Sequence, residues 1–295
     1  MRVSEQAASA LAFSPLTQIL ARRLPVRGGS RLVYEGYRRT AAASRPKPTT
    51  TVSVFGDRFQ VDFDSWLEWQ VWAFGTYEKQ LGEFLGTILR PGDTALDIGA
   101  NFGVHTIRMA KLVGASGLVI AVEAAPSVAQ RLTDNVKLNG LSNVQVVQSA
   151  VTETSGDDVT LHEPAPDDPN KGRASLLGHE YLTGETHEVS TVTVDNLVSG
   201  PIRLMKIDVE GAEIGVLNGA KNTISTHRPV VIFEFNHCLV KSGLSPLDYF
   251  RPLDYELLVM MSSRHPVTGA TRLLLVKPDS APAGNLNILA MPHSA

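Results

Sequence analysis

The chain has 295 residues, of which 43% are hydrophobic, so it can form one large or two small domains with a sizeable core. Its net charge of −3 supplies no overall basic field of the kind that attracts nucleic acid, so no nucleic acid partner is expected. The single cysteine, Cys238, excludes an intrachain disulfide and favours a reducing, cytoplasmic setting, and no apolar run approaches the roughly 18 residues of a transmembrane helix.

Residues 1–50 are expected to form a basic helical extension that ends in a linker. They hold nine basic residues against two acidic ones, which gives this segment a net charge of +7. Leu16, Ile19, Leu20 and Leu24 lie at helical spacing, which predicts a short helix with one apolar face. Residues 40–51 are rich in alanine and proline, which predicts a linker. Packing on the rest of the chain, contact with a membrane surface and a transit peptide are all open interpretations.

Residues 51–93 are expected to form a hairpin and helices that pack on the core. Residues 51–55 and 58–62 alternate in polarity around Gly56-Asp57, which predicts the hairpin. Trp66, Trp69 and Trp72 share one face of the next predicted helix, either as core residues or as an apolar wall over a substrate pocket. A second helix is predicted over 77–89, followed by a turn.

From residue 94 onward, predicted strands alternate with helices, which indicates an α/β fold with a mostly parallel sheet. Residues 152–200 interrupt this alternation, either as a loop over the active site or as a surface excursion, because the proline-rich run 163–170 suits neither helix nor strand. The strands predicted at 255–261 and 273–276 would form an antiparallel hairpin at the sheet edge. The other strands are predicted at 94–96, 118–122, 144–147, 202–207, 230–235 and 286–290, and the helices at 104–112, 127–138 and 212–220.

The segment Asp97-Ile98-Gly99-Ala100-Asn101-Phe102-Gly103 is the most informative motif. A strand end, a turn of small residues and a helix start form a site for a nucleotide-like cofactor. A carboxylate at position 97 would repel a pyrophosphate, but it suits the amino group and sulfonium of S-adenosylmethionine. The NAD fingerprint is absent, because its second glycine falls at Asn101 and no third glycine follows.

Further residues fit the parts of such a cofactor. Glu123 ends the second strand 26 residues after Asp97, where a carboxylate can accept both ribose hydroxyls. Asn101 and Thr106 could hold an amino-acid moiety, and Ser149 and Ala150, at the end of the third strand, lie where an adenine edge would lie.

A second motif, Lys206-Ile207-Asp208-Val209-Glu210-Gly211-Ala212-Glu213, follows an apolar strand and opens a helix. Ligands bind at the carboxyl ends of parallel strands, so Asp208 and Glu210 are placed at or in the site. Asp208 could contact the cofactor's amino group, act as general base or bind a metal. Glu213 is explained as well by interaction with the helix N-terminus.

The fifth strand ends in Glu234, Phe235, Asn236 and His237. Asp208, Glu234 and Asn236 could supply oxygen ligands to Mg²⁺, although hydrogen bonding at the strand end is the more ordinary explanation. His237 is a candidate general base near neutral pH.

Together these motifs resemble the FkbM-type family of S-adenosylmethionine-dependent methyltransferases, over about residues 55–236. The resemblance implies a Rossmann-like class I methyltransferase fold with seven strands, residues 94–295 as the cofactor-binding domain, and O-methylation of hydroxyls on sugars, glycolipids or polyketide-type natural products. The family normally has proline directly after the glutamate, whereas this chain has Glu123-Ala124-Ala125-Pro126. The implied cofactor-binding set is Tyr77, Glu78, Asp97, Gly99, Asn101, Phe102, Gly103, Thr106, Glu123, Ala124, Ser149, Ala150 and Asp208.

The predicted reaction is in-line displacement, in which a substrate oxygen attacks the sulfonium methyl group while a base removes the hydroxyl proton. The candidates for this base are His237, then Asp208, then Glu234. Competing interpretations are a methyltransferase acting on nucleic acid or another small molecule, an NAD-dependent oxidoreductase, and a non-catalytic cofactor-binding protein. The sequence gives no indication of the oligomeric state.

Overall fold

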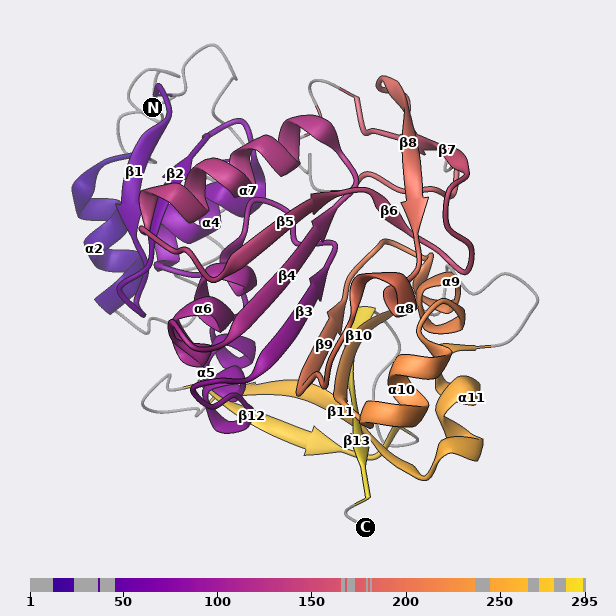
Figure 1. Ribbon diagram of the computed structural model, residues 1–295. Coiled ribbons are helices and arrows are strands. Elements are labelled where there is room, and N and C mark those ends of the chain that lie inside the picture. The colour runs from indigo at the N-terminus through magenta and orange to yellow at the C-terminus, as the bar shows by residue number, and fades with distance from the viewer. Residues whose placement is uncertain are drawn as a thin grey trace.

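A sheet of eight strands runs through the molecule (Figure 1). The computed structural model describes residues 13–23, 37, 46–165, 168, 173–178, 180, 182–236, 245–264, 271–278 and 285–293. In spatial order the strands are β12 (Thr271–Val276), β11 (Tyr255–Arg264), β13 (Asn285–Pro292), β10 (Val230–Asn236), β9 (Leu204–Ile207), β3 (Thr94–Ile98), β4 (Leu118–Glu123) and β5 (Val144–Gln148).

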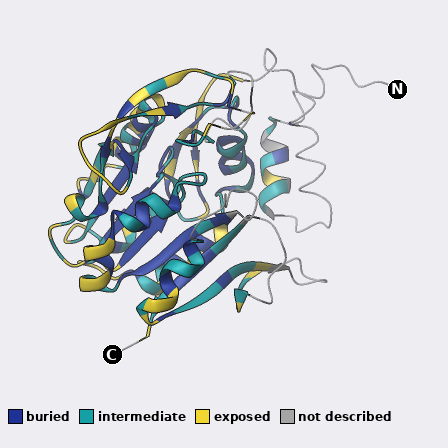
Figure 2. Ribbon diagram, turned by 90° about the vertical axis from the view of Figure 1, so that its right-hand side faces the viewer, coloured by how far each residue is buried: buried dark blue, intermediate teal, exposed yellow. Residues whose placement is uncertain are grey.

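The sheet is parallel from β5 to β10, and helices cover both of its faces. One face packs against α5 (Lys79–Ile88), α6 (Val104–Val113) and α7 (Pro126–Leu138), and the other against α9 (Glu213–Asn218), α10 (Lys221–His227) and α11 (Pro246–Phe250). Burial on both faces explains why the central strands are almost wholly apolar (Figure 2). This is the Rossmann-like architecture expected from the resemblance.

The carboxyl-terminal strands differ in part from the expectation. β11 and β12 pair in antiparallel fashion, which confirms the predicted pairing, and the residues that connect them, 265–270, lie outside the described residues. β13 pairs with both β10 and β11, so it is an interior strand. The resemblance implied seven strands, and β12 adds an eighth at the edge.

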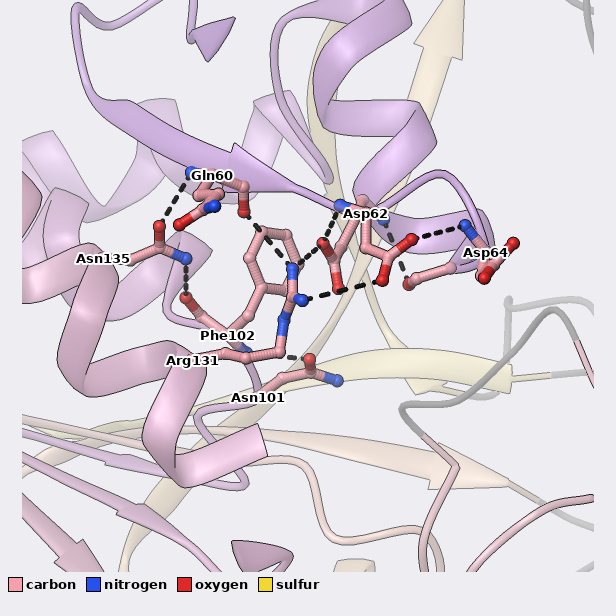
Figure 3. A network of polar contacts seen from close by, with 9 residues as sticks. Gln60, Asp62, Asp64, Asn101, Phe102, Arg131 and Asn135 are labelled. Carbon is pink, nitrogen blue, oxygen red and sulfur yellow. Dashed lines mark hydrogen bonds and ion pairs between the residues drawn. The ribbon is translucent and has the colours of Figure 1, made fainter. Parts of the chain in front are cut away.

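The N-terminal elements pack against α7 and the loop that follows β3. β1 (Thr49–Val52) and β2 (Arg58–Val61) form the predicted hairpin, shifted toward the N-terminus, next to α2 (Pro15–Arg23) and α4 (Trp66–Phe74). Asn135 of α7 accepts a hydrogen bond from the Gln60 backbone N–H at 2.8 Å and donates one to the Phe102 carbonyl at 3.0 Å (Figure 3). One side chain thereby joins β2 to the loop after β3.

An ion pair reinforces this contact. Arg131 of α7 binds the carboxylate of Glu68, a buried residue of α4, and its other terminal nitrogen lies 3.8 Å from Asp62 (Figure 3). Trp69 and Trp72 are buried in the adjoining aromatic core, which supports the interpretation of these residues as core.

Residues 152–200 contain more regular structure than the sequence suggested. β7 (Asp158–His162) and β8 (Thr186–Val192) pair in antiparallel fashion, β6 (Ala150–Val151) runs parallel to β8, and α8 (Val194–Leu197) follows. Leu161 and Val189 are buried in an apolar cluster, and their packing holds this small sheet in place. The polar residues around them make the alternation of buried and exposed positions hard to recognise in the sequence. A short 3₁₀ helix, Arg251–Leu253, follows α11.

No helix among the described residues is long and apolar enough to cross a membrane.

Candidate functional site

A cavity opens at the carboxyl ends of the parallel strands, where the chain order of the sheet reverses. From β3 the chain continues to β4 and β5 on one side, and it returns later to β9 and β10 on the other side. Such a reversal leaves a crevice in which open α/β sheets bind ligands. The loop after β3 and the loop after β9 both line this cavity.

These two loops approach each other closely at Gly99. Its φ is +73°, and a Cβ atom there would lie 1.8 Å from the carbonyl oxygen of Asp208. Only glycine permits this crossing. Gly99, Asn101 and Phe102 line the cavity as expected, whereas Gly103 does not.

Glu123 joins the loop after β3 to the loop after β4. Its two carboxylate oxygens accept hydrogen bonds from the backbone N–H groups of Asn101 and Ala125, both at 2.9 Å. Burial raises the pKa of Glu123, although these N–H groups oppose that shift. The carboxylate is thus held in one orientation at the cavity wall, where its remaining lone pairs can accept two neighbouring hydroxyls.

The wall beyond Glu123 is largely apolar. Ala124, Ser149 and Ala150 line it as expected, together with Val128 and Leu161. A flat apolar slot with a few polar atoms suits a purine ring.

Asp97 lies beneath the loop rather than on the cavity wall. It is fully buried, with Oδ2 accepting the Thr106 hydroxyl at 2.6 Å and Oδ1 lying 3.7 Å from Nζ of Lys206. Thr106 is equally buried, and neither residue lines the cavity. The contact with the cofactor's amino group that the sequence suggested for Asp97 therefore stays a prediction that the structure does not favour.

Three polar residues form a row across the sheet on the other side of Gly99. Phe233 of β10 pairs with Ile207 of β9, which places Glu234 next to Asp208, and Glu234 is paired directly with Asn287 of β13. All three line the cavity. Residues paired across strands point to the same face of a sheet, so their side chains converge there.

Lys206 is the buried cation beneath this row. Its Nζ lies 3.1 Å from Oδ2 of Asp208, in addition to its contact with Asp97. Burial alone would lower the pKa of Lys206, but the charges of Asp208, Asp97 and Glu78 raise it, so the ammonium keeps its proton.

Glu78 faces the same part of the cavity from the start of α5. Its Oε2 lies 3.2 Å from Nε2 of His105 and its Oε1 accepts a 2.7 Å hydrogen bond from Nδ2 of Asn287. Burial opposes ionisation, but the hydrogen bond and charge of His105, with Lys206 and Asn287, bring the pKa of Glu78 below its ordinary value. The adjacent Tyr77 also lines the cavity, and burial raises the pKa of its hydroxyl.

Two other carboxyl groups that line the cavity have raised pKa values. Burial and the charges of Asp208, Glu210, Glu213 and Glu78 raise the pKa of Glu234 to about 8. Burial and the charge of Asp208 raise the pKa of Glu210 to about 7. Glu213 does not line the cavity; it accepts a 3.1 Å hydrogen bond from the Gly211 N–H at the start of α9.

Some predicted site residues cannot be placed. His237 lies outside the described residues, and the side chain of Asn236 is likewise not described. Within the described part of the chain, no group of three or more His, Cys, Asp or Glu residues is arranged to hold a metal ion, so the suggested Mg²⁺ site gains no support.

Three residues of the site were missing from the predicted set: Lys206, His105 and Asn287. Lys206 could have been found as a lysine inside an otherwise apolar strand, and His105 as a polar residue directly after the first loop. Asn287 gave no signal, because it is 209 residues away from its partner Glu78.

The Methyltransferase FkbM domain matches residues 97–258. The chain is 28% identical over 160 residues to the hexuronic acid methyltransferase AglP of Haloferax volcanii, which covers 53% of this chain and 59% of AglP. It is 34% identical over 87 residues to a protein-L-isoaspartate O-methyltransferase of Methanococcus aeolicus, covering 28% of this chain and 40% of that protein.

The matches thus span less than two thirds of the length of these curated relatives, 40% of one and 59% of the other. Among solved structures, the methyltransferase FkbM of Methylobacillus flagellatus KT is similar with a TM-score of 0.42 and 16% identity, over 71% of this chain and 50% of that one.

Proposed function

Because the domain match over residues 97–258 shows that this chain belongs to the FkbM methyltransferase family, we propose that it transfers the methyl group of S-adenosylmethionine to a hydroxyl group. The proposed acceptor is a sugar, a glycolipid or a polyketide-type natural product. The name of AglP, a hexuronic acid methyltransferase, supports a sugar.

The observation that carries this proposal is the charge of the cavity. A sulfonium and an ammonium group are stabilised by carboxylates, whereas the pyrophosphate of NAD would be repelled. Of the described residues that line the cavity, acidic side chains outnumber basic ones, and a bound cation favours the ionised form of those whose pKa is raised: Glu78, Glu123, Asp208, Glu210 and Glu234 against Lys206 and His105.

The shape of the cavity supports one orientation of the cofactor. Glu123 and the apolar slot at β4 and β5 suit the ribose and adenine, and the polar row on β9, β10 and β13 suits the amino-acid end. The methyl group would then lie over the crossing at Gly99, between the two halves. This orientation supports the cofactor-binding roles of Tyr77, Gly99, Asn101, Phe102, Ala124, Ser149, Ala150 and Asp208.

We favour Glu234 as the base that takes the proton of the acceptor hydroxyl. As the acceptor oxygen bonds to the methyl carbon, the carbon–sulfur bond breaks, S-adenosylhomocysteine leaves and the hydroxyl proton moves to the base. A base works best when its pKa is near the operating pH. The pKa of Glu234 is raised to about 8, so its ionised form, which accepts the proton, becomes more populated as the pH rises toward 8. Asp208 is weaker in this role because Lys206 stabilises its charged form.

The test is an assay with labelled S-adenosylmethionine, an extract of glycans and natural products, and mass spectrometry of the labelled products. Glu234→Gln is expected to lower the rate of methyl transfer by about 10²- to 10⁴-fold, with little change in cofactor affinity. Tight binding of NAD without binding of S-adenosylmethionine would refute the proposal, and an unchanged rate in Glu234→Gln would remove Glu234 as the base.

A further inference from the structure

Three carboxylates lie at the end of the cavity that suits the amino-acid part of the cofactor, and each has different partners. Asp208 is bound to Lys206 at 3.1 Å. Glu234 lies between Asp208 and Asn287 in the polar row. Glu78 is held at both oxygens by neutral or weakly basic donors, at 3.2 Å by His105 and at 2.7 Å by Asn287.

The backbone of Glu78 is unusual as well. It is the N-cap residue of α5, yet its side chain makes no capping hydrogen bond. Its φ of 47° lies in the left-handed region, which costs a residue with a side chain about 1 kcal/mol or more. The surrounding structure therefore turns this carboxylate away from its own helix and into the cavity, where Glu78 is a lining residue.

We propose that Glu78, and not the buried Asp97, receives the α-ammonium group of the cofactor's amino-acid moiety, and that Asn287 and His105 are positioning residues that fix its carboxylate. This inference rests on the proposed function, because it assigns a role within the same site. The reaction leaves the ammonium unchanged, so Glu78 contributes to binding and alignment of the methyl donor rather than to bond formation.

Three other acidic residues, Asp97, Asp208 and Glu234, suit the ammonium group less well, each for a different reason. Asp97 is fully buried, and its oxygens already face Thr106 and Lys206. Asp208 has Lys206 as its cation. Glu234, with its pKa raised to about 8, is mostly uncharged at neutral pH, whereas the lowered pKa of Glu78 leaves it ionised. The titratable groups that face Glu78 are His105 of α6, Lys206 of β9, Glu234 of β10 and the adjacent Tyr77.

The proposal can be tested by calorimetry with two ligands. S-adenosylhomocysteine carries the amino-acid moiety, and 5′-methylthioadenosine lacks it. Glu78→Gln is expected to weaken binding of S-adenosylhomocysteine by about 10- to 100-fold, the cost of a hydrogen bond to a charged group. Binding of 5′-methylthioadenosine should stay unchanged, which also shows that the variant is folded.

Glu83→Gln is the matched control, because Glu83 lies on the same helix and pairs with Lys79 in an exposed i,i+4 ion pair. It should bind both ligands like the wild type. If Glu78→Gln weakens both ligands equally, or neither, the proposal is wrong. If the wild type binds neither ligand, the proposed function fails instead.

The role of Asn287 has its own test. Asn287→Asp replaces the hydrogen-bond donor to Glu78 with a second carboxylate. This variant should weaken the binding of S-adenosylhomocysteine but not that of 5′-methylthioadenosine, whereas Asn287→Gln should largely retain the binding of both. Equal weakening of both ligands by Asn287→Asp would mean that Asn287 is only structural.

The pH dependence separates Glu78 from Glu234. With Glu78 as partner, the affinity for S-adenosylhomocysteine should change by less than about threefold between pH 6 and 8. With Glu234 as partner, affinity would rise about tenfold or more over this interval as its carboxyl ionises, and that result would overturn the proposal.

Discussion

At the scale of single residues, the carboxyl groups of the site differ in their environment rather than in their chemistry. Burial opposes the ionisation of both Glu78 and Glu234, but His105, Lys206 and Asn287 lower the pKa of Glu78, whereas the charges of neighbouring carboxylates raise the pKa of Glu234. Two carboxyl groups whose pKa values are pushed apart can take separate roles in one site. Here one suits a permanent anion and the other a proton acceptor.

The raised pKa values predict how stability depends on pH. Glu234 and Glu210 have pKa values of about 8 and 7 in the folded chain, against an ordinary value of 4.5. The folded state therefore binds more protons than the unfolded state between these limits. Their stabilising contribution is fully present below pH 4.5 and is lost as the pH rises to 8, by up to about 1.4 kcal/mol per pH unit for each group.

Urea unfolding at several pH values from 5.5 to 8.5 measures this effect. Glu234→Gln should have a shallower decline in the free energy of unfolding than the wild type. Glu256→Gln is the control, because the hydrogen bond and charge of Lys277 lower the pKa of Glu256 from its ordinary 4.5, which already lies below this interval. Equal slopes in wild type and Glu234→Gln would contradict the prediction.

At the scale of elements, the crossing of two loops at Gly99 determines the shape of the site. Gly99→Ala is expected to lower the free energy of unfolding by about 1–3 kcal/mol more than Gly140→Ala. Both glycines have positive φ, +73° and +66°, but only at Gly99 would a Cβ meet backbone, the Asp208 carbonyl. The comparison thus separates backbone strain from steric overlap.

Chemical denaturation of both variants, followed by cofactor titration, checks this. Gly99→Ala should also lose affinity for S-adenosylhomocysteine, because the two loops that line the cavity are forced apart. A Gly99→Ala variant as stable as Gly140→Ala would show that the two loops tolerate separation.

Elements read from local pattern were predicted well. The β3–loop–α6 unit and Glu123 follow from short local segments, and the loop and Glu123 both line the cavity. The small sheet of β7 and β8 was missed, since its buried residues are few and separated by polar ones. The sequence suggested a ligand contact for Asp97, because it does not reveal that this side chain is fully buried and faces Lys206.

At the scale of the whole molecule, the site depends on chain segments from both ends of the described structure. Glu78 comes before the first strand of the large sheet and Asn287 from β13, the last strand along the chain. Such pairing could not be predicted, because no local pattern indicates that β13 enters between β10 and β11.

The interior position of β13 predicts the effect of truncation. A chain that ends after residue 284 lacks the buried residues Ile288, Leu289 and Ala290 and exposes the edges of β10 and β11. It is expected to aggregate or remain unfolded, because open strand edges pair with other chains. Circular dichroism and gel filtration measure this, with a chain ending after residue 293 as the control that keeps β13.

That control should be folded and should bind S-adenosylhomocysteine. A folded, monomeric product of the shorter truncation would contradict the interior role of β13.

The late position of β13 also determines when during synthesis the protein can acquire its ligand. A nascent chain grows by about 5–20 residues per second, and its earlier segments begin to fold before the later ones exist. The loop after β3 and Glu123 are made early, but Asn287 cannot reach Glu78 until residues 285–292 have left the ribosome. Until then the carboxyl groups of the cavity are present without Asn287, so with the proposed role of Glu78 the cofactor is expected to bind only after this strand has been made.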